Sequence, residues 1–348
     1  MKALTFASVE HVLYESIPDP SILTATDAII KVKRCAICGS DLHVFYGREQ
    51  GLDQHTAMGH EFTGEVVEVG RDVRSLRKGD MVMSPFTTSC GKCFYCVSGL
   101  TCRCVNSQLF GWVENGSGLQ GGQSEFVRVP MADGTLVKIP DGVSLDEALL
   151  LGDILSTGFF CAKQAVIKPK ETQVVIGCGP VGLMAVVGAK HYGSEKLFAI
   201  DTVPERLAMA ARFGAIPVDA SKENAINKIL DATDGRGADA VMEAVGSGGA
   251  GKLAYDLLRP GGTISVVGVC NDEHLSFSPV QAYNKNITYK VGRCPARTMM
   301  DELVPFVQNK KADVASIITH RMKLSDGVSG YDIFANKKDN CLKVVLEP

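Results

Sequence analysis

The chain has 348 residues, with 36 basic and 39 acidic side chains, so its formal net charge is −3. Hydrophobic residues make up 45% of it, which excludes a disordered chain, and the slight acidity argues against a nucleic-acid-binding protein. At about 150 residues per domain, the length predicts two domains. No apolar run reaches the roughly 18–20 residues of a bilayer span, and no secretory leader is expected at the N-terminus. We therefore predict a cytoplasmic protein without membrane association, whose partners are small molecules or other proteins.

Residues 1–140 have the pattern of short β-strands. Runs rich in β-branched residues occur at 29–33, 64–70 and 124–130, and Gly, Asp and Pro separate them. This pattern predicts an irregular sheet or barrel and argues against a helix bundle.

Beyond about residue 165, strand-like runs alternate with amphipathic helical patterns. The helical patterns at 180–193 and 204–214 each end in glycine. The alternation predicts an α/β domain, a doubly wound parallel sheet wrapped by helices. Its expected strands are 173–177, 196–201, 216–220, 238–245 and 263–269. After about residue 287 the content is mixed again, and a strand-like end at 341–347 is expected to rejoin the first domain.

A glycine-rich turn directly follows the strand at 173–177. Gly177, Gly179 and Gly182 form the pattern G-x-G-x-x-G, with Pro180 and Val181 between the second and third glycines. The first glycine permits a tight turn, the second lets backbone amides approach a pyrophosphate, and the third lets the helix pack closely on the strand. The turn therefore predicts a dinucleotide site at a helix N-terminus.

The next strand ends in an acidic residue, Asp201. A carboxylate at this place accepts hydrogen bonds from the ribose hydroxyls of NAD and repels the 2′-phosphate of NADP. Arg206, five residues further on, favours that phosphate, but Asp201 is the better placed of the two. The sequence therefore predicts NAD as the cofactor.

Five of the twelve cysteines crowd between residues 90 and 104. Cys90, Cys93 and Cys96 are spaced C-x2-C-x2-C, and Cys102 and Cys104 follow. A disulfide set fits poorly with a reducing compartment, so this spacing indicates a metal site. Zinc held by four thiolates has no open position, which makes such a site structural.

A second set of possible ligands lies outside this cluster. Cys38 and His60 are 22 residues apart, and each by itself is unremarkable as a packed or solvated residue. A catalytic zinc uses three protein ligands and keeps one exchangeable position, so a third ligand is needed. Asp153 is the best candidate, with Glu61 as the alternative.

Over essentially its whole length, the sequence resembles the zinc-dependent medium-chain alcohol dehydrogenases. The stretch 59–70 is similar to the family's GHE-x2-G-x5-G signature, the cysteine spacing is similar to its structural zinc lobe, and the glycine-rich turn follows in the expected place. The resemblance implies a GroES-like catalytic domain from residues 1–150 and 288–348, and a Rossmann domain from residues 151–287.

The resemblance also implies two zinc ions per chain. One is catalytic, on Cys38, His60 and Asp153; the other is structural, with Cys104 as the fourth ligand of the cluster. Asp153 and the residues after it are similar to those of bacterial secondary-alcohol and glutathione-independent formaldehyde dehydrogenases. Gly39 departs from the relatives that carry an arginine to the pyrophosphate, which implies weaker cofactor binding.

Further roles follow from the same resemblance. Ser40 is expected to receive the substrate proton and to pass it, through the cofactor ribose, to His43. Asp41 is expected to accept a hydrogen bond from His60, and Glu61 to act as an outer carboxylate or a transient ligand. Thr157 is expected beside the nicotinamide. Trp112 is expected either as an aromatic wall of the substrate pocket or as a packing residue.

The sequence thus predicts an NAD-dependent zinc alcohol dehydrogenase for small primary or secondary alcohols. One alternative is a polyol, sugar-alcohol or formaldehyde-type dehydrogenase of the same family. An alternative of another class is a zinc-stabilised NAD-binding sensor without turnover. The relatives imply a homo-oligomer, either a dimer or a tetramer.

Overall fold

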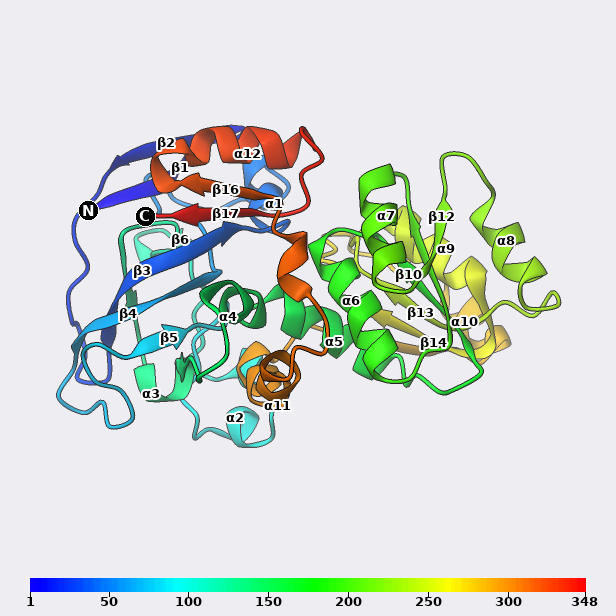
Figure 1. Ribbon diagram of the computed structural model, residues 1–348, viewed down its shortest axis with the longest axis horizontal. Helices are drawn as coiled ribbons and strands as arrows, with labels where there is room; N and C mark the ends of the chain where they lie inside the picture. The colour runs from blue at the N-terminus through cyan, green and yellow to red at the C-terminus, as the bar shows by residue number, and fades with distance from the viewer. The chain divides into compact units, whose positions relative to one another are not determined.

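The computed structural model describes residues 1–348, and the chain divides into two units (Figure 1). The first combines Met1–Ser156 with Pro295–Pro348, so both ends of the sequence contribute to it, and the second is Thr157–Cys294. The assignment of domains with boundaries after residues 150 and 287 stays a prediction. None of the helices combines the length and the hydropathy needed to cross a bilayer.

A seven-stranded sheet is the frame of the first unit. Its order is β16-β17-β3-β4-β5-β9, and β8 also pairs with β3. The strands are β3 (Ala28–Ile37), β4 (Phe62–Val69), β5 (Met81–Met83), β8 (Phe126–Val129), β9 (Val137–Lys138), β16 (His320–Lys323) and β17 (Val344–Glu347). Because β17 pairs antiparallel with β3, the predicted return of the C-terminal strand to the first domain is confirmed.

Two hairpins and several short helices complete the first unit. The hairpins are β1 (Lys2–Ser8) with β2 (His11–Ser16), and β6 (Trp112–Glu114) with β7 (Ser117–Leu119). The helices are α1 (Asp41–Phe45), α2 (Phe94–Val97), α3 (Ala132–Thr135), α4 (Leu145–Leu151), α11 (Ala296–Gln308) and α12 (Gly327–Ala335), with 3-10 turns η1 (Thr101–Arg103), η2 (Val314–Ile317) and η3 (Leu324–Asp326).

The core of the first unit is formed by side chains from its strands, from α12 and from connecting segments. Leu4, Ile30, Phe62, Phe110 and Tyr331 are among the buried residues that pack together there. Burial of one such side chain contributes about 1.5–3 kcal/mol, so this cluster stabilises an otherwise irregular sheet. The strand patterns predicted at 29–33, 64–70 and 124–130 lie in or overlap β3, β4 and β8, which confirms the β-rich first domain.

The second unit contains a six-stranded sheet of order β12-β11-β10-β13-β14-β15, in which every neighbouring pair is parallel. Counted from its first strand this is the order 3-2-1-4-5-6, which confirms the doubly wound Rossmann arrangement. The strands are β10 (Thr172–Ile176), β11 (Lys196–Asp201), β12 (Ile216–Asp219), β13 (Ala238–Glu243), β14 (Leu258–Val266) and β15 (Thr288–Val291).

Helices connect these parallel strands. They are α6 (Pro180–His191), α7 (Pro204–Arg212), α8 (Ala225–Asp231), α9 (Gly248–Leu257) and α10 (Pro279–Lys285), and α5 (Ile154–Gln164) precedes the first strand. Every residue of β10 and β13 is buried, as expected for central strands covered on both faces. The helices predicted at 180–193 and 204–214 are α6 and α7, and the five predicted strands are β10 to β14. Strand β15 was not predicted.

Candidate active site

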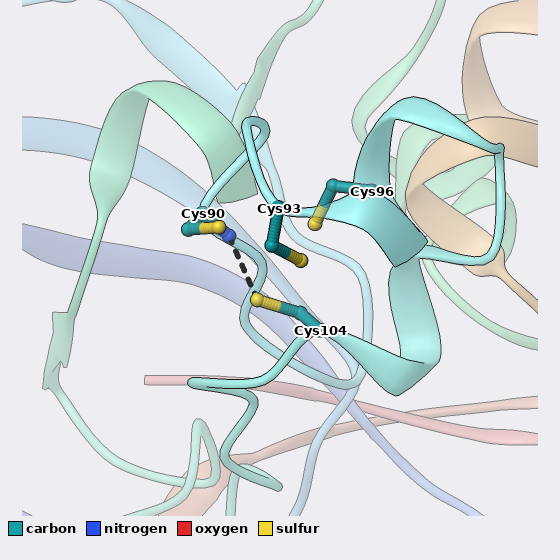
Figure 2. Close-up of side chains that lie close together, drawn as sticks. All are labelled: Cys90, Cys93, Cys96 and Cys104. Atoms are coloured by element: carbon teal, nitrogen blue, oxygen red, sulfur yellow. Dashed lines mark hydrogen bonds between the residues drawn. The ribbon is translucent and has the colours of Figure 1, made fainter.

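The four cysteines of the first motif converge on one point (Figure 2). Cys93 precedes α2, Cys96 lies within it, and Cys104 follows η1. The sulfur atoms of these three residues and of Cys90 all lie within 4.8 Å of one another. Cys102 is buried but does not belong to this group, so the structure brings together the set that the family spacing implies.

Backbone amides point at sulfur atoms of this cluster. The amide of Cys90 donates to Cys104 Sγ at 3.2 Å, and the amide of Asn106 donates to the same sulfur at 3.5 Å. Amide hydrogen bonds from Val105 and Cys96 lower the pKa of Cys93 to about 6. Such bonds favour the thiolate, which is the form that binds zinc, whereas burial raises the pKa of Cys104 and raises that of Cys96 to about 12. The cluster therefore fits a four-thiolate zinc site by ligand type and spacing.

Pairing of β3 with β4 brings the second set of ligands together. The two strands are antiparallel with Cys35 opposite Phe62, so the end of β3 lies beside the start of β4. Cys38 directly follows that end, and His60 lies two residues before that start, with Glu61 between them. Asp153 comes from the turn between α4 and α5.

Helix α4 holds this last turn in place. Its N-terminus is a capping box, in which the Ser144 hydroxyl accepts from the Glu147 amide and the Glu147 carboxylate accepts from the Ser144 amide. The C-cap residue that follows it, Gly152, packs so closely that a Cβ there would lie 2.3 Å from Ser84 O. Only glycine allows the turn that carries Asp153 to approach the sheet in this way.

The donor atoms have the spacing of a zinc site. Asp153 Oδ2 lies 3.4 Å from Cys38 Sγ and 3.3 Å from His60 Nε2, and all three residues are buried. Zinc bonds of roughly 2.0–2.3 Å place tetrahedral ligands roughly 3.3–3.8 Å apart. Thiolate, imidazole and carboxylate are all zinc ligands, so these residues fit the metal by both chemistry and distance.

Two neighbours of the metal site match the predicted surroundings. His60 Nδ1 lies 3.3 Å from Asp41 Oδ1, which favours the tautomer that leaves Nε2 free for a metal. Ser40 Oγ lies 3.3 Å from His60 Nε2, beside the donor set. His43 is on the same short helix, α1, and its Nδ1 is buried without a hydrogen-bond partner. Burial lowers the pKa of His43.

A buried ion pair borders the metal ligands. Glu61 belongs to the same group of donor atoms, and its Oε1 accepts from Lys343 Nζ at 2.6 Å. Both side chains have no exposed surface, and Lys343 Nζ also donates to Ile37 O at 3.0 Å. Glu61 Oε2 is buried with no hydrogen-bond partner. Sequence reasoning missed Lys343, because a lysine in a terminal strand is normally exposed.

The glycine-rich turn of the second unit has the sterics that its motif predicts. A Cβ on Gly182 would lie 1.7 Å from Gly177 O, and Gly177 itself has φ +84° with a neighbouring side chain 2.4 Å from its Cβ position. Gly179, the N-cap of α6, differs: the nearest atom to its Cβ position is Arg206 Nη1 at 3.9 Å. The space over Gly179 is thus left open at a helix N-terminus, as a pyrophosphate requires.

Asp201 is anchored to this turn. Its Oδ2 accepts from the Cys178 amide at 2.7 Å, and its Oδ1 accepts from the amides of Thr202 and Val203 at 2.7 and 2.9 Å. Arg206 Nη1 lies 3.9 Å from Asp201 Oδ2. The carboxylate and the guanidinium therefore lie together beside the glycine-rich turn.

Two predicted residues remain, Thr157 and Trp112. Thr157 is buried in α5. Trp112 begins β6, and its Nε1 lies 3.5 Å from Glu114 Oε2. The residue before it, Gly111, packs on the backbone of Gly59, which precedes His60. The roles of Thr157 and Trp112 stay predictions.

Comparison with known proteins places this geometry in a family. Residues 24–141 match the model of the alcohol dehydrogenase GroES-like domain, and residues 180–309 match that of the zinc-binding dehydrogenases. Zinc-type alcohol dehydrogenase B of Aspergillus flavus is 43% identical over 352 residues, which cover 99% of this chain and 80% of the relative. The chain belongs to the zinc-dependent medium-chain alcohol dehydrogenases. It is therefore an oxidoreductase with a GroES-like domain and a Rossmann domain.

Two further members of the family are similar along nearly the whole chain. Alcohol dehydrogenase TADH from Thermus sp. ATN1 superposes with a TM-score of 0.93 at 35% identity, covering 100% of this chain and 99% of that one. The glutathione-independent formaldehyde dehydrogenase of Bacillus subtilis is 32% identical over 92% of this chain and 86% of its own length. Membership in this zinc-type family implies a small-molecule substrate.

Proposed function

We propose that the chain is an NAD-dependent zinc alcohol dehydrogenase, which transfers a hydride between a small primary or secondary alcohol, or the matching aldehyde or ketone, and NAD. The observation that carries the proposal is the buried donor set of Cys38, His60 and Asp153, with donor atoms 3.3–3.4 Å apart in two of the three pairs. The same chain carries a dinucleotide turn with open space over Gly179.

The residues around the donor set support this chemistry. Zinc bound there supplies Lewis acidity toward the substrate oxygen. Cys38, His60 and Asp153 hold the ion, and Asp41 keeps His60 in the tautomer that ligates through Nε2. The Ser40 hydroxyl, 3.3 Å from His60 Nε2, is the proposed acceptor of the substrate proton.

His43 is the proposed outer proton acceptor. It is half-buried, and its lowered pKa keeps the imidazole neutral at pH 7, so that it can accept a proton. Glu61 is proposed as a carboxylate next to the ligands that Lys343 holds in place. Thr157 is proposed to contact the nicotinamide.

A second zinc is proposed for Cys90, Cys93, Cys96 and Cys104, which gives two zinc ions per chain. Four sulfur ligands leave no exchangeable position, so this ion is structural. Cysteine clusters of this kind need a reducing compartment, which supports a cytoplasmic enzyme.

NAD is the proposed cofactor because Asp201 stands at the end of the second strand of the Rossmann order. Three backbone amides hold its carboxylate in place, so it is oriented before the cofactor binds. A fixed negative charge there accepts from ribose hydroxyls and repels a 2′-phosphate. The neighbouring Arg206 supports some use of NADP.

The edge of the second sheet supports a homo-oligomer. β15 is the last strand, and an unpaired edge is a template for a strand of another chain. Large apolar or aromatic side chains near it are exposed, with Val291 60% and Tyr283 82% accessible. We propose a dimer formed across this edge, as such or as half of a tetramer. Light scattering of the purified protein distinguishes monomer, dimer and tetramer.

The substrate class is tested by turnover with a panel. Zinc-loaded protein and NAD are mixed with primary alcohols, secondary alcohols, polyols or formaldehyde, and NADH is followed by absorbance. The proposal expects NADH from small primary or secondary alcohols. Turnover of polyols alone, or of formaldehyde alone, would support the family alternatives, of which the Bacillus relative favours the second.

A matched pair of variants distinguishes an enzyme from a sensor. Cys38→Ser removes a proposed ligand, whereas Cys35→Ser alters another buried thiol three residues earlier, outside the donor group. The proposal expects turnover to be lost in the first variant and kept in the second. No NADH from any substrate of the panel would refute the proposed activity.

A further inference from the structure

We propose that Gln123 is a positioning residue for the metal site, that it acts through Asp41, and that Tyr331 fixes the orientation of its amide. The inference rests on the proposed function, because it concerns the zinc site of Cys38, His60 and Asp153. Neither Gln123 nor Tyr331 belongs to the donor group.

The starting point is the set of bonds to the Asp41 carboxylate. Its Oδ1 faces His60 Nδ1 at 3.3 Å. Its Oδ2 accepts from the amide of Cys38 at 2.9 Å and from Gln123 Nε2 at 3.0 Å. Gln123 is thus the side chain that holds the oxygen turned away from the histidine. Because these two hydrogen bonds fix Oδ2, the other oxygen, Oδ1, is directed at His60 Nδ1.

The environment of Gln123 fixes which way its amide points. Nε2 donates to Ala36 O at 3.1 Å as well as to Asp41 Oδ2, so both of its N–H groups are used. Oε1 accepts from the Tyr331 hydroxyl at 2.8 Å. A flipped amide would set its oxygen against two acceptors, a carbonyl and a carboxylate. Gln123 has no exposed surface, so water cannot replace any of these bonds.

Tyr331 completes the line of hydrogen bonds. It lies in α12, is 1% exposed, and stacks on Phe45 of α1 with ring centroids 5.7 Å apart. Burial raises the pKa of Tyr331 well above its usual value, so the hydroxyl keeps its proton and remains a donor. Its donation to Gln123 Oε1 selects the amide orientation that presents Nε2 to Asp41.

The backbone around Gln123 is equally constrained. Its amide donates to Met58 O at 2.9 Å, and its carbonyl accepts from the Leu4 amide at 2.8 Å. Its side chain passes over Gly59, where a Cβ would lie 2.4 Å from Gln123 Cγ. Gly59 directly precedes His60, so Gln123 also constrains the backbone position of the segment that carries this ligand.

Together these contacts form a buried series of bonds, from Tyr331 through Gln123 and Asp41 to His60. Its members come from four distant segments of the first unit. Partners that orient a ligating histidine change metal affinity by about 10–100-fold when they are removed. Removal of a residue that orients such a partner, as Gln123 orients Asp41, is therefore also expected to lower metal affinity.

The test measures metal affinity at each site separately in the full-length protein. Co²⁺ bound by one thiolate, one imidazole and one carboxylate absorbs differently from Co²⁺ bound by four thiolates, so a titration with Co²⁺ followed by absorption spectroscopy distinguishes the two sites. Gln123→Met keeps the length of the side chain and removes the amide, and Tyr331→Phe removes a single hydroxyl.

The expected result is a loss of affinity confined to the mixed site. Gln123→Met weakens Co²⁺ binding there by about 10–100-fold. Tyr331→Phe weakens it by about 2–10-fold, the effect of one hydrogen bond. In an Asp41→Asn background, Gln123→Met has little further effect, because the two residues act in series.

Two matched controls separate positioning from general loss of structure. Tyr46→Phe removes a hydroxyl that also contacts α12, by donating to Ala335 O at 3.2 Å, but has no bond to Asp41. Gln173→Met changes a glutamine with no exposed surface in the second unit. Both controls are expected to bind Co²⁺ as the parent does.

The outcomes are distinct. An affinity of folded Gln123→Met within about two-fold of the parent at the mixed site, or an equal loss at the four-thiolate site, overturns the inference. If Gln123→Met does not fold, Tyr331→Phe decides, and an effect no larger than that of Tyr46→Phe overturns it. A parent protein that binds no metal at the mixed site refutes the proposed function instead.

Discussion

The buried pair of Lys343 and Glu61 gives a prediction whose magnitude follows from the structure. In Lys343→Met, Glu61 Oε1 loses its donor at 2.6 Å, Oε2 already has none, and Ile37 O loses a donor at 3.0 Å. Neither side chain has exposed surface, so no water replaces the lost ammonium. Breaking a buried pair in this way costs about 3–5 kcal/mol of unfolding free energy.

Urea unfolding at a fixed zinc concentration measures this cost, because bound ligand shifts apparent stability. The only tryptophan, Trp112, lies in the same unit as the pair, so its fluorescence reports the unfolding of that unit. Lys338→Met is the matched control. Lys338 pairs with Asp332, and both side chains are about half exposed. Exposed pairs of this kind contribute about 0–1 kcal/mol to the free energy of unfolding. A second change, Glu61→Met, is expected to restore much of the stability lost in Lys343→Met. A loss in Lys343→Met no greater than in Lys338→Met would refute the reasoning.

Three further predictions concern the cofactor, the proton path and the cysteine cluster. Asp201→Asn removes the charge and keeps one acceptor oxygen, enough for the amides of Thr202 and Val203 but not also for that of Cys178, so the kcat/KM ratio of NADP to NAD is expected to rise about tenfold or more in initial-rate assays; an unchanged ratio would argue that Asp201 does not select the cofactor. For His43, burial lowers the pKa below 6.5, so alcohol oxidation in the parent falls as the pH drops through that lowered pKa and the ring becomes charged. His43→Gln is expected to lose this limb of the kcat/KM profile, and a limb that persists contradicts the role. Cys93→Ser is expected to lose one zinc per chain by metal analysis and to unfold at lower temperature, while a variant that keeps both ions would exclude the structural site.

The fold was predictable where local pattern decides it. Apolar runs and helical periodicity gave the strands β10 to β14, and the glycine-rich turn marked the start of α6. At Gly177 and Gly182 a Cβ atom would collide with its neighbours, so only glycine fits. This requirement is why the motif can be recognised in the sequence. Strand β15 escaped prediction, because a polar edge strand such as Thr288–Val291 has no continuous apolar run.

The candidate metal ligands stand out in the sequence for a different reason. Cys38 and His60 lie next to the adjoining ends of two neighbouring strands. The spacing of the cysteines around Cys93 is typical of a metal site and is seldom found without one. Asp153 comes from a distant turn; it is expected as the third ligand because a catalytic zinc needs one, with Glu61 as the alternative, and the resemblance to the family implies the same residue.

The residues that hold the neighbours of the candidate ligands could not be predicted from the sequence. Lys343 is 282 positions from its partner Glu61, and Tyr331 is 208 positions from Gln123. Lysine, glutamine and tyrosine occur widely on surfaces, so their types do not signal burial. Their partners become evident only when the two ends of the chain meet in one unit.

The zinc content of the purified protein and of Cys38→Ser tests the catalytic metal most directly. Metal analysis is expected to find two zinc ions per chain in the parent, and a single ion with no turnover in the variant. One ion per chain in the parent, together with unchanged zinc content and activity in Cys38→Ser, would contradict a catalytic metal held by Cys38, His60 and Asp153.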